Sequence, residues 1–237
     1  MIPQLNVEFV LEVLEAAAVL VSAVAGMIVA ANKGMDLVGT FALACVNAFG
    51  GGTVRDLLLD NRPFYWMQHW EYLAAILAIC VPFVYSARIF RVASAVHRRS
   101  VIVDALGLAL FTITGVGIAE AHHAPIAVAL LMGVITGTMG GVLRDVVVNE
   151  VPDMFRPGGL YATASFAGAI AFVTSIRYYD LNYGQAAFIA TFVTVLLRLL
   201  SVRLNVAIPA PHWVVPSQMG HNSERASRPP ADSEESR

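Results

Sequence analysis

The sequence predicts an all-α polytopic membrane protein with seven transmembrane helices, arranged as two inverted three-helix repeats followed by a seventh helix. Three observations support this: composition, a series of apolar runs and an internal repeat. Of the 237 residues, 57% are hydrophobic and only 14% are charged, whereas about a quarter of an average soluble domain is charged. The formal net charge is only -2, so the overall balance does not suggest a nucleic-acid partner.

Seven uncharged apolar runs follow one another along the chain. Each approaches the roughly 20 residues that a helix needs to cross about 30 Å of hydrocarbon, once its flanking turns are added. Soluble core helices would not occur in such an unbroken series. The runs cover residues 16–31, 37–54, 72–87, 105–119, 124–143, 157–176 and 181–197.

The positions of basic residues predict how these helices are oriented. The connection between the third and fourth spans, residues 88–99, holds four arginines and is the most basic of the loops. Basic loops of membrane proteins lie in the cytoplasm. Alternation from this loop places the N-terminus outside, Lys33 inside and the C-terminus in the cytoplasm.

An internal repeat is the strongest signal within the sequence. Placing Arg55-Asp56 on Arg144-Asp145 gives an offset of 89 residues (from 55 to 144). So many identities in one register do not arise from a single chance motif. Because each unit has three spans, the second must enter the membrane from the opposite side, which makes an inverted repeat of the kind found in transporters. The same offset superposes Ala16 on Ala105, Gly26 on Gly115, Ala30 on Ala119, Pro63 on Pro152 and Tyr72 on Tyr161.

The chain therefore divides into four predicted parts. Residues 8–88 form the first three-helix repeat and residues 97–177 the second, inverted one. Residues 181–204 form the seventh transmembrane helix. Residues 205–237 are rich in Pro, Ser and charge, a composition typical of a disordered tail, here a cytoplasmic one.

The second and fifth spans each contain a Gly-Gly-x-x-Arg-Asp element. Glycine costs about 1 kcal/mol relative to alanine inside a helix and permits a kink or break. In a membrane, the backbone groups so exposed need neighbours or water. One interpretation is a kinked helix beside an aqueous pathway; the other is close helix packing through small residues. The candidate pathway residues are Gly50, Gly51, Gly52, Arg55 and Asp56 in one copy, and Gly140, Gly141, Arg144 and Asp145 in the other.

The two arginines need partners, because intramembrane charges are usually paired. Consecutive residues point about 100° apart on a helix, so Asp56 and Asp145 are not expected to pair with the arginine beside them. They would remain free to face the pathway and attract a cation. The simpler alternative is that both arginines extend to opposite membrane surfaces. The expected partners lie at matching depth in the first and fourth spans, giving the pairs Arg55 with Glu15 and Arg144 with Asp104.

The duplicated Gly-Gly-x-x-Arg-Asp motif, in a seven-span chain of this size, resembles the bacterial branch of the trimeric intracellular cation channel (TRIC) superfamily, also called the glycine-transporter-domain family. The resemblance covers about residues 8–204. It implies a homotrimer in the bacterial inner membrane, with a pore in each protomer between the kinked second and fifth helices that passes monovalent cations, chiefly potassium. Animal members carry a lysine-containing motif in place of Arg55 and Asp56, so their voltage and calcium responses are not carried over.

Two other functions stay open. Broken helices with free N–H groups and an arginine form a carboxylate site, which would suit a secondary transporter of glycine or a similar small zwitterion. A membrane scaffold or lipid-binding role is the other. No catalytic constellation or metal-ligand spacing occurs, and Cys45 and Cys80 lie in apolar runs, so neither an enzyme nor a cofactor or metal site is expected.

Overall fold

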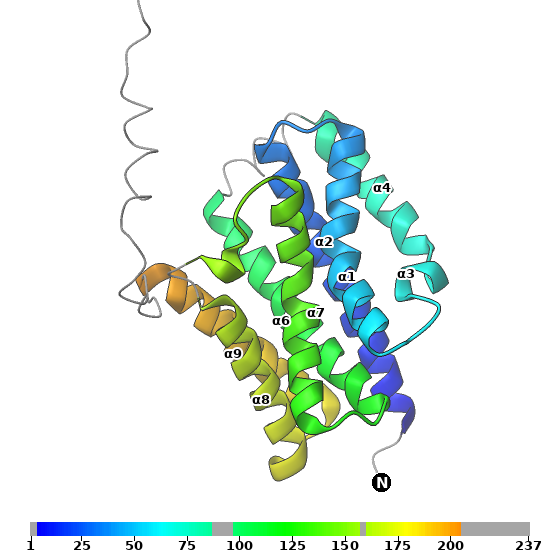
Figure 1. Ribbon diagram of the computed structural model, residues 1–237, viewed down its shortest axis with the longest axis vertical. Helices are drawn as coiled ribbons and strands as arrows, with labels where there is room; N and C mark the ends of the chain where they lie inside the picture. Colours follow the sequence, from blue (N-terminus) through cyan, green and yellow to red (C-terminus); the bar gives the residue numbers. More distant parts are fainter. Residues whose placement is uncertain (1–3, 87–96, 157–159, 205–237) are drawn as a thin grey trace, which may run out of the picture. The chain divides into compact units, whose positions relative to one another are not determined.

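The computed structural model describes residues 4–86, 97–156 and 160–204, and the regular secondary structure in these ranges is helical (Figure 1). The expected basic connection and the tail at 205–237 fall outside the described residues, except that Arg98 and Arg99 belong to the first turn of a helix. In chain order the helices are α1 (Gln4–Asn32), α2 (Leu37–Leu58), α3 (Tyr65–Gln68), α4 (Glu71–Tyr85), α6 (His97–Ala121), α7 (Ile126–Val147), the 3-10 helix η1 (Asp153–Phe155), α8 (Tyr161–Tyr179) and α9 (Tyr183–Leu204).

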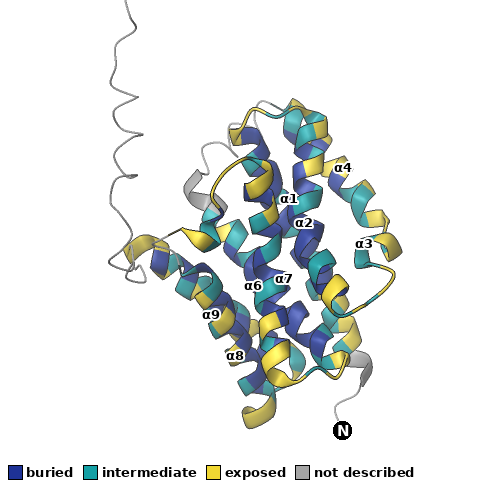
Figure 2. Cartoon of the chain, viewed as in Figure 1, coloured by how far each residue is buried: buried dark blue, intermediate teal, exposed yellow. Residues whose placement is uncertain are grey.

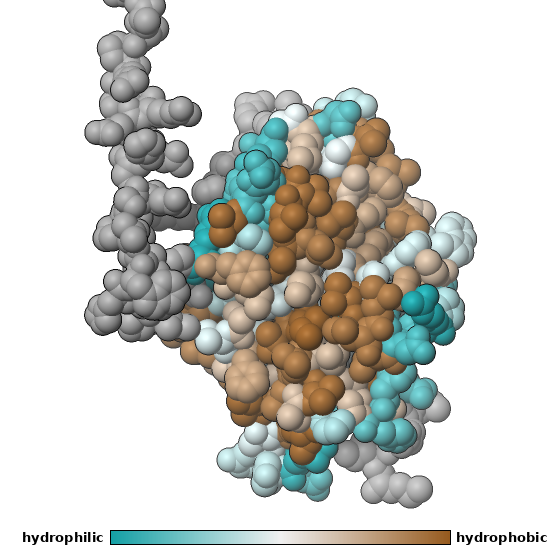
Figure 3. Space-filling model, viewed as in Figure 1, coloured by the Kyte–Doolittle hydropathy of each residue, from teal (hydrophilic) through white to brown (hydrophobic). Residues whose placement is uncertain are grey.

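Among the described residues, five helices are long and apolar enough to cross a membrane: α1 from Val7, α2, α6 from Val101, α7 and α9. Helix α4 is apolar but has only 15 residues, about 22 Å at 1.5 Å per residue. Helix α8 has 19 residues and falls outside the group of five. Apolar side chains cover the middle of the face in Figure 3, and polar ones gather towards its margins, which suits a membrane protein.

Four helices make the centre of the helical unit. Helix α1 packs on α2, α6 packs on α7, and the two pairs meet where α2 contacts α7 and α1 contacts α6. Helix α4 packs on α1 and α2, and α8 packs on α6 and α7, while α9 covers α6 and α8. Buried residues concentrate on the sides of the central helices that face one another (Figure 2).

The turns that join these helices recur at the offset found in the sequence. Gly34 follows α1 with a φ of 67°, and His123, 89 residues later, follows α6 with a φ of 56°. Asp60 and Asn149, also 89 residues apart, follow α2 and α7 with φ of 51° and 56°. Left-handed residues other than glycine are uncommon, so the two halves share backbone conformation as well as residue identities.

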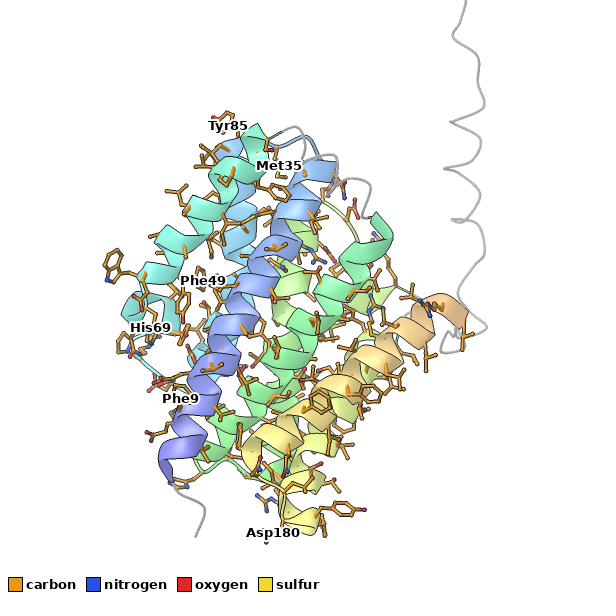
Figure 4. All side chains as sticks on the ribbon, turned by 180° about the vertical axis from the view of Figure 1, so that it is seen from behind. Phe9, Met35, Phe49, His69, Tyr85 and Asp180 are labelled. Carbon is orange, nitrogen blue, oxygen red and sulfur yellow. The ribbon has the colours of Figure 1, made fainter. Side chains whose placement is uncertain are left out.

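The two ends of the helical unit are visible in Figure 4. Met35, between α1 and α2, and Tyr85, at the end of α4, lie at one end, and Asp180, after α8, lies at the other. Because α7 runs towards the Met35 end, its final Arg144-Asp145 lies there, while α2 carries Arg55-Asp56 away from it.

Candidate functional site

Helices α2 and α7 meet through their glycines. A Cβ atom added to Gly51 would clash with the carbonyl oxygen of Thr136, and one added to Gly140 would clash with that of Asn47. A Cβ at Gly50 would lie 2.8 Å from Leu143 Cδ1. The glycines therefore let two backbones approach more closely than any larger residue would allow.

The glycines do not interrupt either helix. Residues Leu37–Leu58 and Ile126–Val147 are each one continuous α-helix. The sequence allowed a kink or a break at the glycines, and the structure excludes the break, although glycine has a weak helix propensity. Packing against the opposite helix compensates for that weakness, so close packing is the interpretation that the structure supports.

Arg55 is buried in a cluster of two carboxylates. Its Nη1 lies 2.9 Å from Glu15 Oε1 on α1, and its Nε donates to Asp56 Oδ1 at 2.8 Å. Asp56 Oδ2 in turn accepts from the backbone N–H of Tyr65 at 3.4 Å. Arg55 is 1% exposed and Asp56 fully buried, so this cluster is enclosed by protein.

Arg144 repeats this arrangement at the other end of the α2–α7 crossing. Its Nη1 donates to Asp104 Oδ1 on α6 at 2.9 Å, and its Nε donates to Asp145 Oδ1 at 2.8 Å. Asp145 Oδ2 accepts from the backbone N–H of Asp153 at 3.2 Å. Both clusters thus contain one arginine, two carboxylates and a backbone donor from the segment that follows the motif.

These geometries bear on three expectations. The structure brings together both expected pairs, Arg55 with Glu15 and Arg144 with Asp104. The expectation that each arginine cannot pair with the next residue was wrong, because the long side chain folds back and its Nε reaches the adjacent carboxylate. Asp56 is consequently buried and bonded, and is not free to face an aqueous pathway. Both arginines are buried within the protein and do not extend to its surface.

The remaining glycines of the motif lie beside the guanidinium groups. A Cβ at Gly52 would be 3.7 Å from Arg55 Nη2, and one at Gly141 would be 3.6 Å from Arg144 Nη2 and 2.9 Å from the hydroxyl oxygen of Tyr161. The motif therefore combines two roles. Its glycines leave room for the neighbouring helix and for the arginine side chain that folds back. Its Arg-Asp pair bonds to neighbouring segments of the chain.

The two clusters differ in their access to solvent. Beside Glu15 and Asp56 there is a space of only about 10 Å³, lined by Tyr65 and Trp66 among others. Tyr65 stacks on Tyr72 with ring centroids 5.8 Å apart. Beside Arg144 the structure has a cavity of about 280 Å³. Its charged lining residues are Lys33, Arg144, Arg156 and Arg198, with Asp104, Asp145, Glu150 and Asp153.

Arg198 is a member of this site that the sequence analysis missed. The predicted seventh helix, 181–204, contains this residue but gave it no role, and the structure places it within α9. Its Nη2 lies 3.3 Å from Asp153 Oδ2, and its guanidinium lies 4.6 Å from the centre of the Tyr161 ring. The sequence signal that could have identified Arg198 is a single arginine with apolar residues on both sides.

Two acidic residues at the mouth of the cavity have shifted pKa values of opposite sign. The hydrogen bond and charge of Lys33, 2.5 Å away, lower the pKa of Glu150 below its ordinary value. Burial raises the pKa of Asp153, and the nearby Asp104 and Asp145 add to this increase against the opposing effect of Arg198. Within the described ranges, no group of three or more His, Cys, Asp or Glu side chains is placed to bind a metal ion.

Comparison with known proteins places these features in a family. The sequence model of the family described as "Glycine transporter" matches residues 12–88 and again residues 101–177, which repeats the offset of 89 residues (from 12 to 101). A UPF0126 membrane protein of Vibrio cholerae is 35% identical over 189 residues, covering 80% of this chain and 77% of the relative. The UPF0126 inner membrane protein YadS of Escherichia coli is 33% identical over 192 residues, covering 80% and 90%.

Solved structures are similar over nearly their whole length. The TRIC trimeric intracellular cation channel orthologue from Rhodobacter sphaeroides superposes with a TM-score of 0.75 at 31% identity, covering 83% of this chain and 99% of that one. A structure described under "Structural basis for conductance through TRIC cation channels" gives a TM-score of 0.72 at 27% identity, covering 84% and 96%.

Proposed function

This chain belongs to the glycine transporter family, and from that membership we propose that it forms an inner-membrane channel for monovalent cations, chiefly potassium. The similar solved structures are described as cation channels, and a related protein is described as an inner membrane protein. Because those relatives are channels, no enzymatic activity is proposed. Each protomer of a homotrimer would contain its own pathway.

The charge of the two clusters is the observation that carries this proposal. Each cluster holds two carboxylates and one arginine: Glu15, Asp56 and Arg55 in one, and their counterparts around Arg144 in the other. With all groups ionised, each cluster has a net charge of −1, although its most prominent residue is an arginine. A negative charge at each end of a pathway attracts cations and excludes anions.

The proposed pathway follows the crossing of α2 and α7. It would run from the polar cavity at Arg144, past the glycine contacts, to the Arg55 cluster beneath Tyr65. A Cβ at Gly51 would clash with the carbonyl oxygen of Thr136, so α2 and α7 are in close contact along this proposed route and conduction would require them to separate. Glycine and carbonyl contacts, unlike large interlocking side chains, permit such a movement with little repacking.

The proposed topology is an inverted repeat of residues 8–88 and 97–177 with a seventh helix at 181–204. In this arrangement α4 and α8 complete seven spans, with the N-terminus outside and the C-terminus in the cytoplasm. The offset of 89 residues in the family matches and in the left-handed turn residues supports it. The cavity beside Arg144 then opens towards the cytoplasm.

One observation favours transport of a zwitterion as the second candidate. The cavity lining contains four basic and four acidic side chains, a balance that could hold the carboxylate and the ammonium group of glycine at the same time. A cation channel has no need for such balance at its entrance. The cavity is also large enough for a solute of this size.

Purified protein in potassium-loaded liposomes separates the two candidates. A channel would release potassium at a rate proportional to its electrochemical gradient, without saturation by glycine. A transporter would accumulate labelled glycine with saturation and would leak no potassium. Phe188→Leu, a substitution at an exposed position of α9, controls for the effect of reconstitution. Saturable glycine uptake without potassium efflux would overturn the channel proposal.

A further inference from the structure

Arg198 has fewer partners than the other two buried arginines. Arg55, Arg144 and Arg198 are each at most 5% exposed. Arg55 and Arg144 each pair with two carboxylates. Arg198 has one ion pair within the described ranges, from Nη2 to Asp153 Oδ2 at 3.3 Å, and its Nε has no hydrogen-bond partner there. A buried N–H group without a partner is unfavourable, so Arg198 retains the capacity to bind a further acceptor.

The position of Arg198 makes its guanidinium group available to a ligand. Arg198 lines the cavity of about 280 Å³ beside Arg144. Its guanidinium carbon lies over the ring of the buried Tyr161, 4.6 Å from the ring centre. The ring covers one face of the planar group and favours this position. The N–H donors lie along the edges of a guanidinium group, in a geometry that matches the two oxygens of a carboxylate.

Asp153 is the lining carboxylate with the weakest pairing. Its Oδ1 lies 3.9 Å from Arg156 Nε, beyond the usual N–H···O hydrogen-bond distance of about 2.7–3.2 Å, and its side chain is 45% exposed. The other charged lining residues pair more closely among themselves: Arg144 with Asp104 and Asp145, and Glu150 with Lys33 and Arg156. Asp153 can therefore accept a hydrogen bond from a cationic group in the cavity.

Arg198 and Asp153 together match the charges of an α-amino acid. The two side chains present opposite charges 3.3 Å apart at the cavity wall. An α-amino acid carries its carboxylate and its ammonium group on the same carbon atom, so the charges of the ligand are also close together. Placed antiparallel to the ion pair, the ligand would have its carboxylate on Arg198 and its ammonium group on Asp153. With four basic and four acidic lining residues, a zwitterion also leaves the net charge of the cavity unchanged.

Within the described ranges, this arrangement occurs at one end of the protein only. At the offset of 89 residues, Asp153 corresponds to the uncharged Phe64. Arg198 lies in α9, outside both matched halves. Beside the opposite cluster the space is only about 10 Å³, on the order of one water molecule. Duplication of an ancestral segment therefore does not account for this pair of side chains, and the opposite end has no room for the same ligand.

We propose that the cavity is a binding site for a small α-amino acid, in which Arg198 binds the carboxylate and Asp153 binds the ammonium group. The inference rests on the proposed function for the class of ligand, since it takes up the zwitterion candidate, but binding does not depend on transport. Glycine is the smallest ligand of this class and serves as the probe.

Equilibrium binding of labelled glycine to the purified full-length protein in detergent tests this site without any ion flux. The wild type should bind glycine saturably. Arg198→Gln removes the charge and the paired donors, so the dissociation constant should rise at least tenfold. Arg203→Gln, at an exposed position of the same helix, should bind like the wild type. Arg198→Lys keeps the charge but loses the planar pair of donors, and should weaken binding several-fold. It keeps the test valid if Arg198→Gln does not fold.

Competition at constant ionic strength separates the two halves of the ligand. In the wild type, excess acetate and excess methylammonium should each displace labelled glycine, because acetate occupies Arg198 and methylammonium occupies Asp153. Asp153→Asn should weaken glycine binding several-fold, and the remaining glycine should be displaced by acetate but not by methylammonium. A purely structural role of Asp153 would not separate the two competitors. Asp180→Asn, an exposed carboxylate at the other end of the helical unit, should leave binding unchanged.

Absence of saturable glycine binding by the wild type would overturn the site, as would equal affinities of the wild type and the Arg198 variants. These outcomes are distinct from failure of the proposed function. Glycine binding that depends on Arg198, in a protein that releases no potassium from liposomes, would contradict the channel and keep the site. Potassium efflux by a protein that binds no glycine would do the reverse.

Discussion

Arg55 Nη1 lies 2.9 Å from Glu15 Oε1, and both side chains are buried between α1 and α2. The pair is held mainly by charge, because Nη1 has no directed hydrogen bond. Asp56 still neutralises Arg55 when Glu15 loses its charge, so the expected cost is that of leaving the buried Nη1 group poorly paired, about 1–3 kcal/mol.

Glu15→Gln is therefore expected to lower the thermal midpoint of the purified protein strongly. The measurement is the loss of the folded peak in size-exclusion chromatography after heating in detergent. Glu8→Gln, at an exposed position of the same helix, is the matched control and should behave like the wild type. Equal midpoints for both variants would show that the buried pair does not stabilise the fold.

Gly51→Ala tests the close approach of α2 and α7. The added methyl group would clash with the carbonyl oxygen of Thr136, and overpacking of this kind costs about 1–3 kcal/mol. Thermal stability should fall and the monodisperse peak should shrink. Gly184→Ala in α9 is the control, because a Cβ there has only Asn182 Oδ1 nearby, at 3.6 Å, and should be neutral. A Gly51→Ala protein as stable as Gly184→Ala would contradict the assigned packing.

Asp104→Asn tests the charge argument for cation selectivity. It removes one of the two carboxylates around Arg144, so the net charge of that cluster changes from −1 to zero. The ratio of potassium to chloride permeability, read from reversal potentials in a KCl gradient, should fall several-fold. Asp180→Asn removes an equal charge far from the cluster and should leave the ratio unchanged. An unaltered ratio in Asp104→Asn would remove the cluster from the permeation pathway.

The dependence of stability on pH should differ between Glu150 and Asp153. Glu150 has a lowered pKa in the folded state, so its contribution is present above its ordinary pKa of 4.5 and is lost as pH falls through the lower folded value. Asp153 has a raised pKa, compared with an ordinary 3.8. Its ionised form disfavours folding, and this unfavourable effect is relieved as pH falls through the raised value.

Thermal midpoints of three proteins between pH 7.5 and pH 4 check both signs. Relative to the wild type, Glu150→Gln should be less stable at pH 7.5, with the difference shrinking as the pH falls towards 4. Asp153→Asn should match or exceed the wild type at pH 7.5 and lose that advantage on acidification. The opposite order at pH 7.5 would contradict the electrostatic assignment of both residues.

The family, the helical class and the partners of the two arginines could be predicted from the sequence. The family resemblance inferred from the two Gly-Gly-x-x-Arg-Asp motifs is confirmed by the family matches, and the all-helical class is confirmed by the described helices. Glu15 and Asp104 could be chosen as partners because depth along a helix follows from residue count. The side-chain path of an arginine does not follow from residue count, so its bond to the adjacent aspartate was missed.

Composition, hydrophobic runs and the offset of 89 residues are properties of the chain itself, and they establish the membrane class, the helices and the matching halves before folding is considered. Contacts between segments distant in sequence depend on the folded chain. Only the folded structure shows that the glycines pack against a neighbouring helix and do not interrupt the helix that contains them. The packing between the helices compensates for the weak helix propensity of glycine. Folding also brings Lys33, Glu150, Arg156, Asp153 and Arg198 into one line, since no local pattern relates a turn after α1 to a side chain on α9.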